Sequence, residues 1–168
     1  NAENIDIKKI SPNFILSLIN KWKNLGWYPD DVILKKGESF EKNLLKIYKI
    51  YQSKLNNLNA CDFGDLILHC VSIFEKNQDI CQMYSKNFRY ILVDEYQDTN
   101  FIQSKWLKLL TKTHDNICCV GDDDQSIYSW RGAEIKNFLE FDKIYKDTKI
   151  IRLEENYRST QNILNVAS

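Results

Sequence analysis

Three short apolar runs in the second half of the sequence constrain the fold more than any other feature. They occupy residues 90–93, 117–120 and 150–153, contain several β-branched residues, and are too short to form helices. Helical patterns at residues 101–111 and 135–141 separate them. Because strand and helix alternate at this spacing, the sequence predicts an α/β fold with a parallel sheet and flanking helices.

The part of the chain before these runs has a helical pattern. Ser11 and Pro12 form a typical helix start, and apolar residues recur at helical spacing until Gly26. Three further helical patterns follow, at residues 40–58, at a stretch opened by Asp62 or Gly64, and at residues 79–86. We therefore expect a helical region at 1–60 and the sheet-containing region within 61–168.

Composition limits the class of protein without identifying it. The chain is 43% hydrophobic and 27% charged, as expected of a globular protein, and no apolar run approaches the roughly 20 residues of a membrane span. The five cysteines lack CxxC pairs and histidines at zinc-ligand spacing, so we expect reduced thiols in a cytoplasmic protein. Among them, Cys118 and Cys119 are expected to be buried strand residues.

Charge and chain ends add two weaker indications. The net charge is zero, but residues 1–60 carry ten Lys/Arg against six Asp/Glu, and residues 61–168 carry thirteen against seventeen. A mildly basic first region suits contact with a phosphate backbone, and solvated helix faces explain it equally well. The chain begins with Asn1 and stops at Ser168 within a helical pattern, so we expect a piece of a longer protein.

The first apolar run leads directly into the sequence DEYQDTN at residues 94–100. Ligands of open parallel sheets bind beyond the carboxyl ends of the strands, which is where Asp94 and Glu95 are expected. Two carboxylates there suit nucleotide hydrolysis, in which one holds Mg²⁺ and the other positions or deprotonates the attacking water. For an isolated Asp-Glu pair, a solvated acidic loop is the favoured alternative.

The second and third apolar runs are also followed by polar sequences. Residues 121–133 read GDDDQSIYSWRGA, in which Gln125 suits a terminal phosphate and Tyr128, Trp130 and Arg131 suit stacking on single-stranded bases. Core packing of the two aromatic residues is an equal alternative. Residues 153–160 read LEENYRST, where Arg158 suits a γ-phosphate contact and Tyr157 suits base stacking. Taken singly, Arg158 is better explained by an ion pair with Glu154 or Glu155.

Taken together, these three sequences resemble the Walker B-type, third and fourth conserved motifs of superfamily 1 DNA helicases of the UvrD/Rep/PcrA type. Residues 59–67, NACDFGDLI, resemble a short DNA-contact motif of the same enzymes. The resemblance implies part of a P-loop NTPase (RecA-like) motor domain at residues 61–168, preceded at 1–60 by part of a helical subdomain inserted into it. It implies an ATP-dependent 3′–5′ helicase or translocase, active in DNA repair or replication restart.

The resemblance also implies roles for individual residues. Asp94 would hold Mg²⁺ and Glu95 would be the catalytic base, while Gln125 and Arg158 would contact the γ-phosphate of ATP. Tyr157 would stack on the adenine. The residues implied to line the pockets for single-stranded bases are Phe63, Tyr128 and Trp130, with Arg131 beside them. The helices of the first region would grip duplex DNA.

Two departures from the family pattern matter. Gly64 stands where the family often has a second acidic residue, which leaves the DNA contact there undefined. The sequence also contains no GxxxxGK[ST] phosphate-binding loop, and the second motor domain is missing. Because that loop supplies most of the triphosphate contacts, we expect this polypeptide alone to hydrolyse ATP negligibly and to need the remainder of a helicase chain.

Two other functions remain open at the level of sequence. One is the helicase portion of a helicase–nuclease, which would require a nuclease domain downstream. The other is a passive single-strand-binding module that uses Phe63, Tyr128 and Trp130. Plain DNA binding does not require four phosphate-directed groups, which argues against the passive module.

Overall fold

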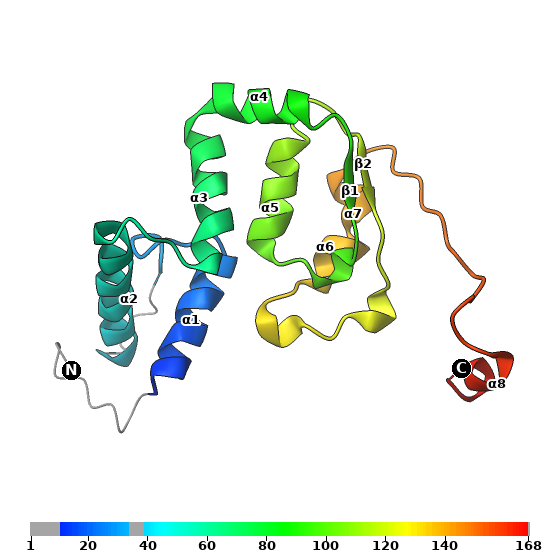
Figure 1. Cartoon of the computed structure of the whole chain (residues 1–168), viewed down its shortest axis with the longest axis horizontal. Coiled ribbons are helices and arrows are strands. Elements are labelled where there is room, and N and C mark those ends of the chain that lie inside the picture. The colour runs from blue at the N-terminus through cyan, green and yellow to red at the C-terminus, as the bar shows by residue number, and fades with distance from the viewer. Residues whose placement is uncertain (1–10, 34–38, 168) are drawn as a thin grey trace.

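Four helices precede the sheet. In the computed structural model, which describes residues 11–33 and 39–167, these helices are α1 (Pro12–Asn24), α2 (Ser39–Asn57), α3 (Phe63–Lys76) and α4 (Gln78–Asn87) (Figure 1). All four were predicted, and the fourth begins one residue earlier than expected. Residues 1–10 and 34–38 of the predicted first region lie outside the described residues.

The helix starts follow from local capping. Ser11 Oγ accepts a hydrogen bond from the Phe14 amide at 3.2 Å, with Pro12 at the first helical position. At the start of α3, Asp62 Oδ1 accepts from the Asp65 amide at 2.9 Å and Asp65 Oδ2 accepts from the Asp62 amide at 3.3 Å. This reciprocal capping box fixes α3 as a helix that begins at Phe63.

The sheet consists of two parallel strands, β1 (Ile91–Val93) and β2 (Ile117–Cys119), with Ile91 opposite Ile117. Helix α5 (Phe101–Leu110) connects them and packs against α3 and α4. The crossover from strand to helix to parallel strand was predicted, and it brings the carboxyl ends of both strands to one edge. Figure 1 shows the loops that follow them side by side at that edge.

The elements after β2 are short. They are the 3-10 helices η2 (Asp123–Gln125) and η3 (Ser129–Arg131), the helices α6 (Ile135–Leu139) and α7 (Phe141–Ile144), and the terminal α8 (Gln161–Ala167). A further 3-10 helix, η1 (Tyr96–Asp98), follows β1. Helix α6 contacts η1 and η2, so the segment after β2 folds back onto the loop after β1.

Two expectations about strands are wrong. Residues 150–153 form no strand, and Ile150, Ile151 and Leu153 are 72%, 68% and 86% exposed, because no neighbouring strand pairs with this run. Cys118 is exposed and Cys119 is half-buried, although both were expected to be buried. Only alternate residues of each strand face the helices, so Leu92 and Cys118 lie on the open face of the sheet.

A fully buried lysine joins the N-terminal helices. Lys23 Nζ in α1 contacts Asp62 Oδ2 at 2.7 Å and Asp65 Oδ1 at 2.8 Å, and it lies 5.3 Å from the ring centre of Tyr51 in α2. The Lys23 side chain is 0% exposed. Gly64 makes room for it, since a Cβ there would lie 2.9 Å from Lys23 Cδ. A buried cation with two carboxylates therefore ties α1 and α2 to the start of α3.

The helices and the cysteines of the described residues also bear on the expectations from composition. No helix of the described residues is long and apolar enough to cross a membrane. All five cysteines are free thiols in the structure. Burial raises the pKa of the Cys119 thiol to about 12, which keeps it protonated and unreactive near neutral pH.

Candidate nucleotide and DNA site

The loop after β1 presents two carboxylates on an unusual backbone. Glu95 adopts the left-handed region with φ 52° and ψ 43°, which costs a non-glycine residue about 1 kcal/mol or more. Asp94 Oδ1 accepts a hydrogen bond from the Glu95 amide at 2.9 Å, which supports this turn. Both carboxylates are exposed, as expected of groups that act on a ligand.

The residues that follow anchor this loop in the core. Tyr96 and Gln97 are each 1% exposed, and the Tyr96 amide donates to the Val120 carbonyl at 3.0 Å. Burial raises the pKa of Tyr96, partly offset by a hydrogen bond with Ser104 in α5. The Tyr96 ring meets Phe141 of α7 edge-on at 5.5 Å between ring centres. The carboxylates therefore project from a loop whose next two side chains are fixed.

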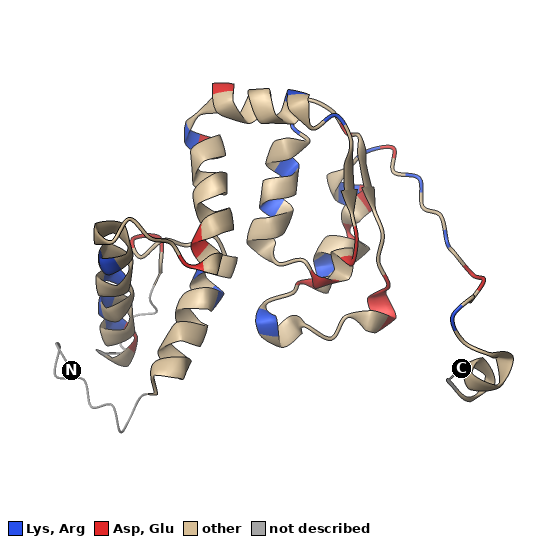
Figure 2. Ribbon diagram, in the orientation of Figure 1, with Lys and Arg blue, Asp and Glu red and all other residues tan. Residues whose placement is uncertain are grey.

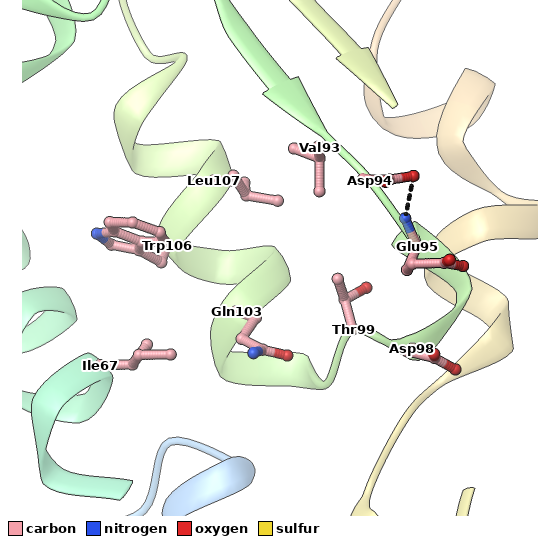
Figure 3. A pocket seen from close by; sticks show the side chains of 9 residues that line it. All are labelled: Ile67, Val93, Asp94, Glu95, Asp98, Thr99, Gln103, Trp106 and Leu107. Atoms are coloured by element: carbon pink, nitrogen blue, oxygen red, sulfur yellow. Dashed lines mark hydrogen bonds between the residues drawn. The ribbon is translucent and has the colours of Figure 1, made fainter. Parts of the chain in front are cut away.

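A pocket of about 290 Å³ lies beside these carboxylates. Figure 3 shows that its lining comes from three places: the end of β1 with the following loop, α5, and Ile67 of α3. Val93, Trp106 and Leu107 supply apolar walls, and the acidic side chains lie along one edge. The pocket can accommodate a small group next to the carboxylates.

The loop after β2 carries the predicted phosphate contact. Gln125 ends η2 and is exposed, and its Nε2 donates to Asp122 Oδ2 at 2.7 Å. Asp122 also caps η2, because its Oδ1 accepts from the Asp124 amide at 3.0 Å. The Gln125 amide is thus held by its own loop and stays accessible at the sheet edge.

The two loops are directly connected. Gln97 Nε2 donates to Glu95 Oε2 at 2.7 Å, and Gln97 Oε1 accepts from the Asp122 amide at 3.1 Å. Asp94, Glu95 and Gln125 therefore lie on two loops that are joined by hydrogen bonds at one edge of the sheet. Figure 2 shows the acidic residues of both loops gathered below the strands.

The predicted base-stacking residues form a cluster in and beside η3. The ring centres of Tyr128 and Trp130 are 6.4 Å apart, and Arg131 Cζ lies 5.3 Å and 5.7 Å from them. Trp130 is 78% exposed, so it is not a core residue. Trp130 lies in the 3-10 helix and Tyr128 directly precedes it, half-buried, so the two rings lie close together with Trp130 on the surface.

The backbone of this cluster is held from two directions. Asn24 Nδ2 of α1 donates to the Arg131 carbonyl at 3.1 Å, and Gly132 adopts φ 92° beneath it. On the other side, the Glu134 amide donates to the Thr99 carbonyl at 2.9 Å. The cluster is therefore fixed both to the N-terminal helices and to the loop after β1.

Phe63 lies at the first position of α3 and is 91% exposed. Its position is set by the neighbouring Asp62, whose side chain caps the helix, contacts Lys23 and accepts from Tyr51 Oη at 2.9 Å. Burial raises the pKa of Asp62, but the hydrogen bonds from Lys23, the Asp65 amide and Tyr51 outweigh it and leave the pKa lowered. A charged, half-buried residue that is held by several hydrogen bonds thus precedes the exposed Phe63 ring.

Tyr157 and Arg158 lie apart from these groups. Figure 1 shows the chain after α7 running away from the sheet toward α8. Tyr157 is 86% exposed and donates to Glu155 Oε2 at 2.7 Å, while the Arg158 amide donates to Asn156 Oδ1 at 3.0 Å. Among the described residues, the Arg158 guanidinium forms neither the ion pair with Glu154 or Glu155 nor a contact with the loops after β1 and β2.

The acidic loop could supply one or two of the oxygen ligands of a magnesium ion. Asp94, Glu95 and Asp98 offer oxygen ligands, and Asp98 Oδ1 is buried without a hydrogen-bond partner in the described chain. Mg²⁺ commonly takes one or two carboxylates and completes its shell with phosphate oxygens and water. No trio of His, Cys, Asp or Glu in residues 11–33 and 39–167 is arranged to hold a metal.

Sequence reasoning missed three residues that organise the site: Lys23, Gln97 and Asp122. Gln97 and Asp122 stand within the quoted motifs, but their contacts span 25 positions and leave no local signal. Lys23 was an unremarkable member of a helical pattern. A lysine on the buried face of that pattern is the one signal that could have marked it, because lysine is almost never fully buried without partners.

Comparison with known proteins gives a consistent result. Residues 1–146 match the family described as UvrD/REP helicase N-terminal domain. Over 99% of its length, the chain is 46% identical to the probable DNA helicase II homolog of Rickettsia conorii and 44% identical to ATP-dependent DNA helicase PcrA of Staphylococcus epidermidis. It is 47% identical to DNA helicase II of Rickettsia typhi. The chain spans 26%, 23% and 25% of these proteins, respectively.

Proposed function

Because the chain belongs to the UvrD/REP helicase N-terminal domain family, we propose that it is part of the motor of an ATP-dependent DNA helicase. In the intact protein this motor couples ATP hydrolysis to movement along single-stranded DNA. The names of the similar proteins, DNA helicase II and PcrA, support this proposal. Residues 1–60 belong to a helical subdomain, and residues 61–168 belong to a RecA-like motor domain whose P-loop lies elsewhere in the intact protein.

One observation carries the proposal: phosphate-directed and base-directed side chains occupy one continuous, anchored segment. Gln125 is held by Asp122, and the cluster of Tyr128, Trp130 and Arg131 follows within the same loop. Backbone hydrogen bonds join this loop to the acidic loop after β1. A movement of Gln125 can therefore be transmitted to Tyr128, Trp130 and Arg131 through a short segment of the same loop.

The residues divide into three tasks. Asp94 holds Mg²⁺, which when bound neutralises charge on the phosphates, and Glu95 accepts the proton of the attacking water. Gln125 contacts the γ-phosphate. Phe63, Trp130 and the residues beside Trp130 stack on single-stranded bases, while the lysines of α2, which Figure 2 shows along that helix, suit the backbone of duplex DNA.

Tyr157 and Arg158 retain their proposed roles in adenine stacking and γ-phosphate contact as predictions. Figure 1 shows the segment between α7 and α8 running away from the sheet, so these roles require residues 146–160 to approach the sheet edge when the rest of the protein and nucleotide are present. Resemblance to the family is the whole support for these two assignments. The same support underlies the 3′–5′ direction and a role in DNA repair or replication restart.

The experiment is performed on the full-length protein that contains this chain. Steady-state ATP turnover is measured with and without single-stranded DNA, and unwinding is compared on duplexes with a 3′ or a 5′ tail. We expect DNA-stimulated turnover and unwinding of the 3′-tailed duplex only. DNA binding without any ATP turnover would instead support the passive binding module, and Mg²⁺-dependent DNA cleavage would support the helicase–nuclease.

A further inference from the structure

We propose that Gln97 is a positioning residue that sets the orientation of Glu95 according to the position of the loop that carries Gln125. This inference rests on the proposed function. Four residues form one continuous path: Glu95 Oε2 accepts from Gln97 Nε2 at 2.7 Å, and Gln97 Oε1 accepts from the backbone N–H of Asp122 at 3.1 Å. Asp122 Oδ2 then accepts from Gln125 Nε2 at 2.7 Å.

The chemistry of the partners fixes the direction of the Gln97 amide. An ionised carboxylate only accepts hydrogen bonds, and a backbone N–H only donates them. The Gln97 nitrogen must therefore face Glu95, and its oxygen must face Asp122. A reversed amide would place oxygen against carboxylate and N–H against N–H, so neither end could be satisfied.

The surroundings of Gln97 prevent the amide from moving independently. Its side chain is 1% exposed, and it passes beneath Gly121. A Cβ at Gly121 would lie 2.5 Å from Gln97 Oε1 and 2.8 Å from Phe138 Cε2. The absence of a side chain at Gly121 is thus what allows a buried amide to reach from one loop to the other.

The arrangement has a specific consequence for Glu95. Gln97 occupies Oε2, whereas Oε1 accepts no hydrogen bond from the described residues and is the oxygen that could accept a proton from the attacking water. The backbone of Glu95 is already in a left-handed turn, so the side-chain bond to Gln97 determines which oxygen is presented. A shift of the Asp122 loop, as Gln125 engages phosphate, would therefore rotate the Glu95 carboxylate through Gln97.

The test uses two variants of the full-length protein that break the path at different points. Gln97→Met keeps the length of the side chain and removes both hydrogen bonds. Asp122→Ala releases Gln125 at an exposed position and also removes the side-chain cap of η2. Gln52→Met is the matched control, because Gln52 is also buried, at 6% exposed, and bonds only to Asp65. Each is assayed for kcat and KM for ATP at saturating single-stranded DNA, with the active fraction determined by DNA titration.

We expect Gln97→Met and Asp122→Ala each to lower kcat about tenfold or more while KM for ATP changes less than about threefold. A displaced catalytic group slows the chemical step but leaves the contacts that bind ATP in place. The double variant should be no slower than the slower single variant, because both changes interrupt one path. Gln52→Met should leave kcat per active site unchanged.

Two results would overturn the inference. One is a Gln97→Met enzyme with wild-type kcat, and the other is a double variant whose loss equals the product of the two single losses. If Gln97→Met fails to fold, the test rests on Asp122→Ala alone. A wild-type kcat in Asp122→Ala would then show that this hydrogen-bonded path does not position Glu95. A wild-type protein without DNA-stimulated ATP turnover would instead reject the proposed function, so the two failures are distinguishable.

Discussion

Glu95 is the residue on which the proposed chemistry depends most directly. Glu95→Gln preserves size and can still accept a hydrogen bond from Gln97, but an amide cannot take a proton from water. We expect ATP turnover of the full-length protein to fall at least about 100-fold, in the range typical of a lost general base. Single-stranded DNA affinity should stay within about twofold, as measured by fluorescence anisotropy.

The matched control is Glu140→Gln, which removes an exposed carboxylate that pairs with Lys143 at the junction of α6 and α7. It should not change turnover. Retention of wild-type turnover by Glu95→Gln would show that the base lies elsewhere in the intact protein.

Trp130 carries the prediction for DNA coupling. Its indole is 78% exposed beside Tyr128 and Arg131, and stacking of a base on an aromatic ring contributes roughly 1–3 kcal/mol. Trp130→Ala should therefore weaken single-stranded DNA binding and raise the DNA concentration for half-maximal ATP turnover by about 5- to 150-fold. ATP affinity without DNA should change little.

Tyr90→Ala serves as the comparison for Trp130, because Tyr90 is another aromatic residue, 79% exposed, just before β1. If both variants, or neither, altered DNA stimulation, Trp130 would not be the specific stacking residue.

Single residues were predictable where their chemistry follows directly from their place in a motif. Asp94 and Glu95 come immediately after a strand, so the sheet-edge rule located them. Gln97 was not predictable, because its role depends on meeting a loop 25 residues away and on the missing side chain of Gly121. The unusual φ of Glu95 has no sequence signal either, since left-handed residues are usually glycine or asparagine.

Among the elements, α1, α2 and α3 depend on the buried Lys23. Lys23→Met leaves the carboxylates of Asp62 and Asp65 without the cation that they share. Breaking a buried ion pair costs about 3–5 kcal/mol of stability. We expect the free energy of unfolding to fall by that amount in urea titrations followed by circular dichroism. Lys49→Met is the matched control, since Lys49 pairs with Asp30 on the surface at 2.7 Å and should cost less than about 1 kcal/mol.

The same cluster predicts a dependence of stability on pH. The pKa of Asp62 is lowered in the folded chain, so its ionised form stabilises the fold above the unfolded pKa of 3.8. That contribution is lost as pH falls through the lower, folded pKa. In urea titrations from pH 7 to pH 3, the stability advantage of wild type over Asp62→Asn should therefore shrink below about pH 4. A constant difference across this range would mean that the charge of Asp62 does not matter.

Elements with their own start signals were predicted closely. Ser11-Pro12 and Asp62 cap the helices that follow them, and capping is a local interaction. The run at residues 150–153 was predicted as a strand on composition, but a strand exists only where a neighbour supplies hydrogen bonds, and none does here. Whether a face of β2 is buried likewise depends on which elements pack against it. The sequence of the strand does not show this, so Cys118 was wrongly expected to be buried.

At the scale of the whole molecule, the described chain brings together only part of the proposed nucleotide site. Carboxylates and Gln125 meet at the sheet edge, whereas the sequence offers no GxxxxGK[ST] loop to bind the triphosphate. We expect the isolated 168-residue polypeptide to show no DNA-stimulated ATP turnover above background in a phosphate-release assay. Full-length protein at the same concentration is the positive control, and steady turnover by the isolated polypeptide would contradict the assignment.

The hydrogen bond from Asn24 to the Arg131 carbonyl has a consequence for how the protein is made. The two residues are 107 positions apart, so the first is synthesised long before the second leaves the ribosome. The turn that displays Trp130 gains this hydrogen bond only when α1 lies in its folded position. During synthesis, we expect the proposed DNA-contacting surface to be completed late, after α1 has formed and packed.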